Sequence, residues 1–167
     1  MKALILARHA KASPKDLPIQ DKDRPLRNSG KTDLLLLRDA LVGQSIKPEH
    51  IFCSTANRAA QTATILAGFY GMCDSISFYD NLYYHGKYEM LEFVKQRDDR
   101  FKKIMVVGHN PELEEVTDIL RGDSSDTRLP TAACICLSFD VDRWDSIRKE
   151  KGRLEFFEYP KKYKREE

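Results

Sequence analysis

The sequence predicts an α/β fold, a three-layer α/β/α sandwich with a mostly parallel central sheet. Short apolar runs typical of buried strands alternate along the chain with segments whose apolar residues recur at helical spacing. That alternation indicates βαβ units, which place helices on both faces of a sheet. The 167 residues fit one compact domain spanning 1–167 and are too few for two ordinary domains.

The first predicted strand leads into a long polar loop. Residues 4–7 are continuously apolar, which is typical of a strand buried on both faces. Residues 11–30 contain three prolines and many charges, so we expect a loop. At about twenty residues it is longer than an ordinary connection, which favours a functional role. A helix capped by Asn28 or Ser29 then presents leucines at helical spacing: Leu34, Leu35, Leu37 and Leu41.

The middle of the chain predicts two further strands and two further helices. Residues 50–54 form a short apolar strand, and a helix follows from Ala56 to a glycine stop at Gly71. Its inward positions are Ala59, Ala63, Leu66, Ala67 and Tyr70. Residues 75–79 indicate a third strand. Residues 87–99 indicate a helix with three inward side chains: Met90, Leu91 and Val94.

The last part of the chain predicts one helix and three strands. Residues 103–109 form the clearest strand, and a helix follows that begins at Pro111 and ends at Gly122. Its apolar face carries Leu113, Val116, Ile119 and Leu120. Two C-terminal strands are expected within 131–142 and 153–160.

Charge and cysteine content exclude several classes of protein. The 28 Lys and Arg against 26 Asp and Glu give a net charge of only +2, without the basic footprint of a nucleic-acid-binding protein. No apolar run approaches the ~20 residues that cross a bilayer, so no membrane association is expected. The four cysteines form no C-x-x-C pair and no signal segment is evident, which favours the reducing cytoplasm.

Basic side chains stand where several predicted strands end. Arg8 and His9 follow the first strand, Arg58 lies in the first turn of the helix after the second, and His109 ends the strand at 103–109. Parallel strands point their carboxyl ends to one edge of the sheet, where α/β proteins bind ligands. Arginine forks match phosphate oxygens, and backbone N–H groups at the helix start, such as that of Asn110, add donors. The sequence therefore predicts an oxyanion pocket at this edge.

The two histidines add chemistry that arginine lacks. A neutral imidazole is a nucleophile, so we expect His9 to attack phosphorus while a protonated His109 helps to hold the oxygens. Taken singly, each residue also has a purely structural interpretation. Arg8 and His9 could belong to a capped turn, Arg58 could be a solvated helix residue, and the His109 ring could bond a backbone carbonyl. Their convergence on one edge is what favours the site.

No metal site is predicted from the remaining candidate ligands. Cys134 and Cys136 lie two apart on one face of a strand, as core residues do, and the other two histidines stand in unrelated contexts. Asp21, Asp23 and Arg24 are expected to form salt bridges within the long loop.

A family resemblance rests on five segments: LARHAKAS, DRPLRNSGK, STANRAAQTA, VVGHNPELEE and LPTAACICL. In this order and spacing they resemble the histidine phosphatase superfamily, and within it the small phosphohistidine phosphatases of the SixA type. The similarity runs from about Lys2 to at least Leu137. The superfamily signature is Arg-His-Gly, and Ala10 takes the third place here, a small departure where the backbone keeps a negative φ.

The resemblance implies a phosphoglycerate mutase-like fold and chemistry without a metal or other cofactor. It also implies that His9 becomes phosphorylated, that Arg8 and Arg58 bind the phosphoryl oxygens, and that His109 stabilises the transferring group. Larger members place an acid in the pocket to protonate a leaving alkoxide. Asp80, Glu89 and Glu112 are available here, but none stands in a recognisable acid motif.

A missing acid favours P–N over P–O substrates, because neutral imidazole leaves without help from a general acid. We therefore expect a phosphatase that hydrolyses phosphohistidine in a protein partner, whose identity the sequence leaves open. A broad small-molecule phosphomonoesterase that uses Glu89 or Asp80 as its acid is an alternative, and so is a phosphoprotein-binding module without turnover. The oligomeric state is open as well.

Overall fold

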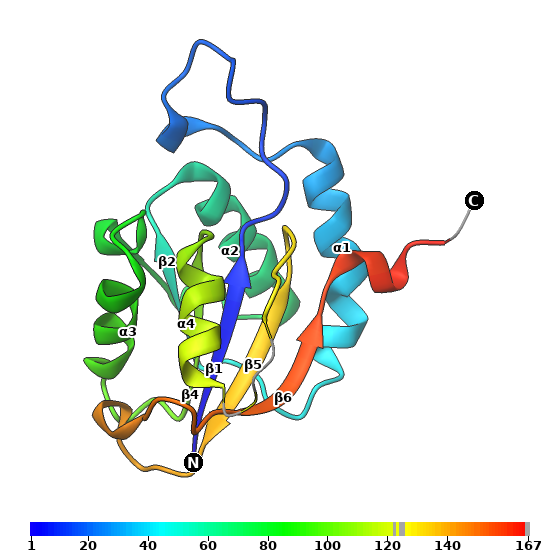
Figure 1. Cartoon of the computed structure of the whole chain (residues 1–167). Helices are drawn as coiled ribbons and strands as arrows, with labels where there is room; N and C mark the ends of the chain where they lie inside the picture. Colours follow the sequence, from blue (N-terminus) through cyan, green and yellow to red (C-terminus); the bar gives the residue numbers. More distant parts are fainter. Residues whose placement is uncertain (122, 124–125, 166–167) are drawn as a thin grey trace.

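The computed structural model describes residues 1–121, 123 and 126–165. In this part of the chain the strands are β1 (Lys2–Arg8), β2 (His50–Ser54), β3 (Ile76–Tyr79), β4 (Lys103–Gly108), β5 (Cys134–Phe139) and β6 (Arg153–Glu158). The α-helices are α1 (Asn28–Val42), α2 (Asn57–Phe69), α3 (Lys87–Lys95) and α4 (Glu112–Leu120). Figure 1 shows how they surround the sheet.

The strands form one mixed sheet in the order β3-β2-β4-β1-β5-β6. The pairs of β2 with β3, β2 with β4 and β1 with β4 are parallel, whereas β5 is antiparallel to both β1 and β6. The mostly parallel sheet predicted from the sequence is therefore confirmed, with β5 as the strand that runs against the others. In the pairing of β1 with β4, Arg8 lies opposite Gly108. The residues that follow them, His9 and His109, therefore leave the sheet at the same level.

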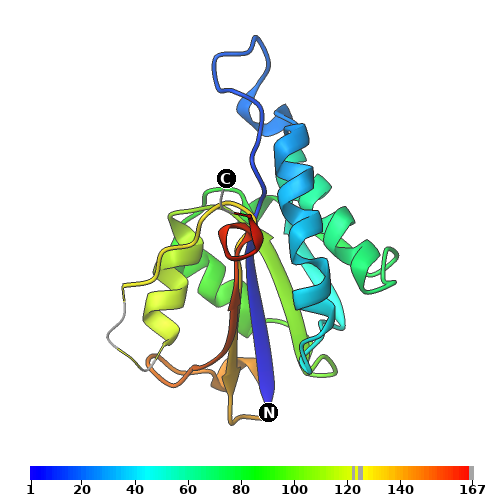
Figure 2. The same ribbon diagram turned by 90° about the vertical axis from the view of Figure 1, so that its right-hand side faces the viewer.

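Helices cover both faces of the sheet and confirm the three-layer arrangement. Figure 2, which views the sheet nearly edge-on, shows α1 and α2 on one side and α3 and α4 on the other. A separate hydrophobic core lies on each face of the sheet, between the strands and the helices that cover them. One core includes Ile5, Leu34, Leu37, Leu66 and Val107. The other includes Leu4, Leu6, Phe93, Val106, Leu113 and Trp144. The central strands supply both cores because successive side chains of a strand point to opposite faces.

Several local expectations differ from the structure. Leu35 is 61% exposed, because the buried face of α1 is narrower than the leucine run and holds Leu34, Leu37 and Leu41. Asn28 is already helical, so the N-cap position falls on Arg27, whose side chain makes no capping bond. Helix α3 ends at Lys95 rather than at 99. The predicted glycine stop at Gly122 lies outside the described residues.

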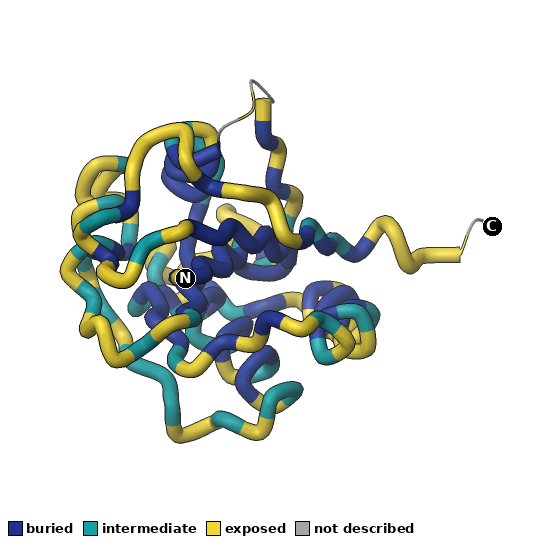
Figure 3. The backbone as a smooth tube through the Cα atoms, turned by 90° about the horizontal axis from the view of Figure 1, so that it is seen from below, coloured by how far each residue is buried: buried dark blue, intermediate teal, exposed yellow. Residues whose placement is uncertain are grey.

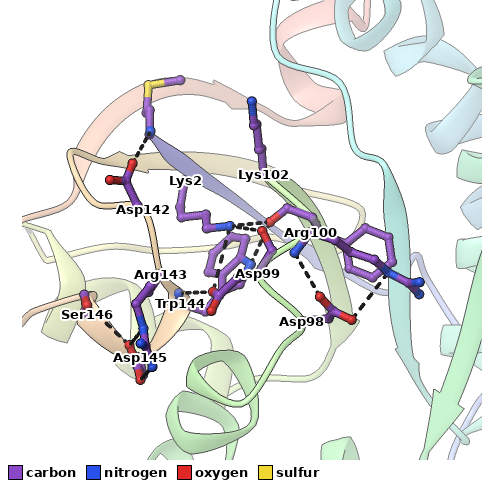
Figure 4. Close-up of polar contacts among 12 residues, drawn as sticks. Lys2, Asp98, Asp99, Arg100, Lys102, Asp142, Arg143, Trp144, Asp145 and Ser146 are labelled. Carbon is purple, nitrogen blue, oxygen red and sulfur yellow. Dashed lines mark hydrogen bonds and ion pairs between the residues drawn. The ribbon is translucent and has the colours of Figure 1, made fainter.

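A buried lysine ties the sheet together at the end opposite the predicted pocket. Lys2 is 2% exposed, and its Nζ donates hydrogen bonds of 2.7 Å to the carbonyl oxygens of Asp99 and Phe101 (Figure 4). The backbone N–H of Trp144 donates to Asp99 Oδ1 at 2.7 Å. These bonds satisfy a buried ammonium group, as burial of a charge requires. They also join the start of β1 to the segment before β4.

The burial pattern follows the layers. Figure 3 shows that the central strands are buried, whereas the loops and the C-terminal segment are mostly exposed. In the described part of the chain, every helix is too short or too polar to span a bilayer.

Candidate active site

Two histidines face each other where β1 and β4 end. The ring centroids of His9 and His109 lie 5.2 Å apart, with an angle of 52° between the planes. His9 is 8% exposed and His109 is fully buried. The pairing of Arg8 with Gly108 produces this contact, because it aligns the ends of two adjacent parallel strands. A hydrogen bond of 3.2 Å from His9 N to the Gly108 carbonyl extends the alignment by one residue.

The ring of His9 is held in one tautomer. Its Nδ1 lies 2.7 Å from the Ala10 carbonyl oxygen, which can only accept, so Nδ1 carries the proton. Burial, reinforced by the charges of Arg58 and Arg8, lowers the pKa of His9 to about 4 although the bond to Ala10 opposes this shift. Near neutral pH the imidazole is therefore uncharged, and its Nε2 keeps a lone pair.

His109 is also neutral. Burial, followed by the charge that His9 carries at low pH and the charge of Arg58, lowers the pKa of His109 to about 3. Its Nε2 lies 2.8 Å from Ser54 Oγ at the end of β2, and the Tyr84 ring centroid lies 4.6 Å from the His109 centroid. The protonated His109 predicted from the sequence is therefore wrong, because the pocket already holds buried cations that disfavour another positive charge.

Arg58 lies in the first turn of α2, as predicted, but its side chain is fully buried. Its Nη1 donates to the Asp21 carbonyl oxygen at 2.8 Å, and its Nη2 donates to Asp21 Oδ2 at 3.1 Å and to the Tyr84 hydroxyl at 2.9 Å. Burial lowers the pKa of Arg58, but the bonds to Tyr84 and Asp21 outweigh it and raise the pKa overall. The interpretation of Arg58 as a solvated helix residue does not fit this environment.

Arg8 ends β1 beside the two rings. Its Nη1 donates to the Leu129 carbonyl oxygen at 3.0 Å, while its Nε is buried without a hydrogen-bond partner among the described residues. The Nε of Arg58 is in the same situation. Two buried N–H groups, one from each guanidinium group, thus have no hydrogen-bond partner among the described residues. The structure brings together Arg8, His9, Arg58 and His109, which come from three separate segments.

The backbone N–H of Asn110, expected to face the oxyanion, stays a prediction, and the side chain of Asn110 has a separate structural role. Both hydrogens of its amide are used, because Nδ2 donates to Glu114 Oε1 at 2.9 Å and to the Leu129 carbonyl at 3.0 Å. The side-chain amide therefore holds the backbone at Leu129 in place. It has no hydrogen left to donate to an oxyanion. Of the backbone N–H groups expected at the helix start, Pro111 has none and that of Glu112 donates to the carboxyl group of the same residue, so the N–H of Asn110 is the remaining candidate donor.

Besides Ser54, four residues of the pocket were not assigned to it from the sequence. Asp21 and Arg24 form the expected salt bridge, with Arg24 Nη2 3.0 Å from Asp21 Oδ1, but the loop folds it against Arg58. Tyr83 donates a hydrogen bond to Asp21 Oδ2, and Tyr84 packs on His109. The unusual length of the loop at 11–30 was the one signal that pointed to Asp21 and Arg24. No feature of the sequence pointed to Tyr83 or Tyr84.

The three candidate acids lie in three different environments. Asp80 is exposed, and hydrogen bonds from Lys22 and Thr55 lower its pKa. Glu89 is exposed on α3. Burial raises the pKa of Glu112, whose Oε2 has no hydrogen-bond partner among the described residues.

Within residues 1–121, 123 and 126–165, no group of three or more His, Cys, Asp or Glu side chains could hold a metal ion. Cys134 and Cys136 are both buried in the core between the sheet and helices α1 and α2. The polar groups of the pocket include two neutral imidazoles, three arginines and one carboxylate, together with the hydroxyls of Ser54, Tyr83 and Tyr84. Permanent cations around a nucleophilic nitrogen are suited to a tetrahedral oxyanion.

Comparisons with known proteins agree with the fold. The model of the histidine phosphatase superfamily (branch 1) matches residues 4–120. A crystal structure of a protein proposed to be the phosphohistidine phosphatase SixA of Agrobacterium tumefaciens has a TM-score of 0.80 and 23% identity, over 95% of this chain and 98% of that one. A counterpart from Nakamurella multipartitia has a TM-score of 0.79 and 25% identity, over 95% and 96%. An uncharacterised protein of Mycobacterium leprae is 27% identical, over 92% of this chain and 99% of its own length.

Proposed function

The chain belongs to the histidine phosphatase superfamily, and from that membership we propose that it hydrolyses phosphohistidine in a protein substrate through a phospho-His9 intermediate. The observation that carries the proposal is the state of His9. Its Nδ1–H is fixed on the Ala10 carbonyl and its pKa is lowered to about 4, so Nε2 is an available nucleophile at neutral pH.

The first step transfers the phosphoryl group to the protein. His9 Nε2 forms a bond to phosphorus while the P–N bond of the substrate breaks, and the imidazole of the substrate leaves as a neutral ring that keeps the proton already held on its other nitrogen. Arg8 and Arg58 supply positive charge to the equatorial oxygens of the transition state. The approach is in line, so the leaving group lies on the far side of phosphorus from His9.

His109 contributes a hydrogen bond rather than a charge. The Ser54 hydroxyl accepts from the Ala56 N–H at 3.2 Å, which leaves its own hydrogen to donate to His109 Nε2. His109 then carries its proton on Nδ1, which is buried without a hydrogen-bond partner among the described residues. An N–H in that position can donate to a phosphoryl oxygen while the ring stays neutral.

The second step releases the product. Water attacks the phosphorus of phospho-His9, the Nε2–P bond breaks, and inorganic phosphate leaves with one proton released to solvent. His9 returns to its neutral form with Nδ1–H still bonded to Ala10. The same arginines serve both steps, because the transferred group occupies the same site in each.

Two carboxyl groups near the pocket, Asp21 and Asp80, are unsuited to act as the general acid that a phosphate ester needs. Burial raises the pKa of Asp21, but hydrogen bonds from Tyr83 and the charge of Arg58 outweigh it and lower the pKa to about 2. Asp80 also has a lowered pKa, through its bonds to Lys22 and Thr55. Both are therefore ionised at neutral pH and hold no proton for a leaving alkoxide, whereas a leaving imidazole whose other ring nitrogen is already protonated needs none. Glu112, whose pKa is raised by burial and whose Oε2 has no hydrogen-bond partner among the described residues, is the candidate acid for an ester substrate.

The partner and the compartment belong to the same proposal. The substrate is a protein that carries a phosphohistidine, and the compartment is the reducing cytoplasm. All four cysteines are free, with Cys53, Cys134 and Cys136 buried and Cys73 exposed, as suits a reducing environment.

The test compares phosphate release from free phosphohistidine, from a histidine-phosphorylated protein and from glycerol phosphate. We expect kcat/KM at least about 100-fold higher on the P–N substrates, a difference of about 3 kcal/mol in transition-state stabilisation. Equal or faster release from the ester would favour the phosphomonoesterase. Phosphate binding without release from any of the three would favour the binding module.

A further inference from the structure

The carboxylate of Asp21 is bound by two of the pocket arginines. Asp21 Oδ2 accepts from Arg58 Nη2 at 3.1 Å, and Oδ1 accepts from Arg24 Nε at 3.0 Å and lies 3.0 Å from Arg24 Nη2. The Tyr83 hydroxyl also donates a hydrogen bond to Asp21 Oδ2. Asp21 belongs to the short 3-10 helix Asp21–Asp23 in the long loop above the carboxyl end of β1 (Figure 1).

These contacts leave Arg58 without a free pair of parallel donors. A guanidinium group binds two oxygens of a phosphoryl group through two adjacent N–H groups on one edge. Nη2 belongs to both such edges of Arg58, and its two hydrogens are committed to Asp21 Oδ2 and to the Tyr84 hydroxyl. Only single donors such as Nε–H remain. A two-point grip on a phosphoryl group therefore requires Nη2 to release one of its acceptors.

The donors of Arg24 are also occupied. Its Nε and Nη2, one complete edge, both face Asp21 Oδ1, and its Nη1 donates to the Ser13 carbonyl at 2.6 Å. The carboxylate thus takes up Nη2 of Arg58 through Oδ2 and one edge of Arg24 through Oδ1, which are donors that phosphoryl oxygens would otherwise use. The two arginines are buried, at 0% and 7% exposed, whereas the Asp21 side chain is 44% exposed. Of the three partners, the carboxylate is the one with room to move.

We propose that Asp21 is a displaceable internal ligand of the phosphoryl site, whose carboxylate yields Arg58 and Arg24 to the incoming phosphoryl group and returns as phosphate leaves. The inference rests on the proposed function in placing a phosphoryl group on Arg58. The guanidinium keeps its place during the exchange, because the backbone carbonyl of Asp21 still accepts from Nη1 at 2.8 Å. Only the side chain has to turn away.

The exchange has a consequence for affinity. Each phosphoryl ligand must break the contacts of Asp21 and meet an ionised carboxylate nearby, so free phosphate binds less tightly than the arginines alone would allow. Weak binding of phosphate favours its release after the second step. A role in which Asp21 only orients the arginines has the opposite consequence, because removal of its charge would then weaken phosphate binding.

The test is the affinity of Asp21→Asn for inorganic phosphate, measured by isothermal titration calorimetry at pH 7. Asparagine keeps the backbone carbonyl bond and the shape of the side chain and removes the charge. We expect the dissociation constant to fall at least about tenfold. The matched control is Asp39→Asn, which removes the same charge from an exposed side chain of α1 outside the pocket. It should stay within about twofold of the parent protein.

Two further variants keep the outcome decisive. Tyr83→Phe removes one hydrogen bond from Asp21 without a change of charge, and it should tighten phosphate binding by a smaller factor even where Asp21→Asn fails to fold. Unchanged or weaker binding in both variants overturns the inference. Arg58→Ala separates this result from a failure of the proposed function. If it abolishes phosphate binding while Asp21→Asn does not tighten it, the phosphate pocket stands and the exchange is wrong. If Arg58→Ala leaves phosphate affinity unchanged, both the proposed phosphoryl site on Arg58 and the exchange of Asp21 are wrong.

Discussion

The Nδ1–H of His9 donates a hydrogen bond of 2.7 Å to the carbonyl oxygen of Ala10, the next residue of the chain. The bond needs no side-chain partner, so the tautomer of the nucleophile is set by the backbone as it leaves β1. Ala10 is held in turn, because its N–H donates to Thr62 Oγ1 at 3.0 Å. Its φ is negative, and alanine therefore replaces the usual glycine here without strain.

The first prediction concerns this nucleophile. His9→Ala should lower turnover of phosphohistidine by at least about 1,000-fold, since no other described side chain replaces Nε2 beside the arginines. It should also abolish the acid-labile phosphoprotein that radiolabelled phosphohistidine produces in the parent protein. His85→Ala removes an exposed histidine of the chain and serves as the matched control. A labelled phosphoprotein that persists in His9→Ala would assign the nucleophile to another residue.

The second prediction concerns pH. The ordinary histidine pKa is about 6.5 in an unfolded chain, and burial lowers that of His9 to about 4 in the fold. The unfolded state therefore binds more protons below pH 6.5. Stability is fully present above that pH and is lost as pH falls toward 4, by on the order of 3 kcal/mol for His9. The lowered pKa of His109 acts in the same direction.

Two measurements check this sign. An NMR titration of the His9 ring should give a midpoint near pH 4 in the folded protein and near 6.5 in urea. The free energy of unfolding should decrease between pH 6.5 and 4, and the decrease should be smaller in His9→Ala. A midpoint of 6 or above in the folded protein would mean that the ring is charged during much of the neutral range, contrary to its proposed role.

The third prediction concerns Ser54. Its Oγ lies 2.8 Å from His109 Nε2, and both residues are fully buried. Ser54→Ala should lower kcat/KM about tenfold, because the loss of one hydrogen bond of about 1 kcal/mol frees the orientation and tautomer of the ring. Ser77→Ala is a close control, since Ser77 Oγ lies 2.8 Å from His50 Nε2 outside the pocket. Equal effects of the two variants on kcat/KM would show that the Ser54 bond is merely structural.

Much of the fold and part of the site followed from local patterns. The strand at 103–109 and the apolar run at 4–7 predicted two central strands, and the rule that parallel strands end at one edge brought His9 and His109 together. That inference needed no knowledge of loop conformation. It holds because a register between neighbouring strands is fixed by the buried faces of both.

The remaining features depend on contacts between distant segments. The position of Asp21 depends on how a proline-rich loop folds over α2. The side-chain amide of Asn110 donates to the carbonyl oxygen of Leu129, which is 19 residues away in the sequence. The charge state of His109 depends on its burial and on the charged groups around it. Leu35 belongs to an apolar run that a helix can bury only in part. None of these is encoded in a short window of sequence.

The fourth prediction tests the seam between α1 and the loop that carries Asp21. A Cβ on Gly30 would lie 2.4 Å from the Lys11 carbonyl oxygen and 2.9 Å from its nitrogen. Backbone atoms cannot rotate away, and the same carbonyl accepts from the Arg27 N–H at 2.9 Å. Gly30→Ala should therefore destabilise the protein by about 1–3 kcal/mol through overpacking. For a chain of this size the expected fall in Tm is about 2–4 °C per kcal/mol.

The matched variant is Gly68→Ala in α2, where an added Cβ meets nothing within 4 Å. There alanine restricts the unfolded chain and favours the helix, so stability should rise by up to about 1 kcal/mol. Gly30→Ala should also weaken phosphate binding, because Lys11 lies two residues after His9 and the loop that it starts leads on to Asp21. A Gly30→Ala protein with parental Tm and parental phosphate affinity would show that the helix and the loop can separate without disturbing the pocket.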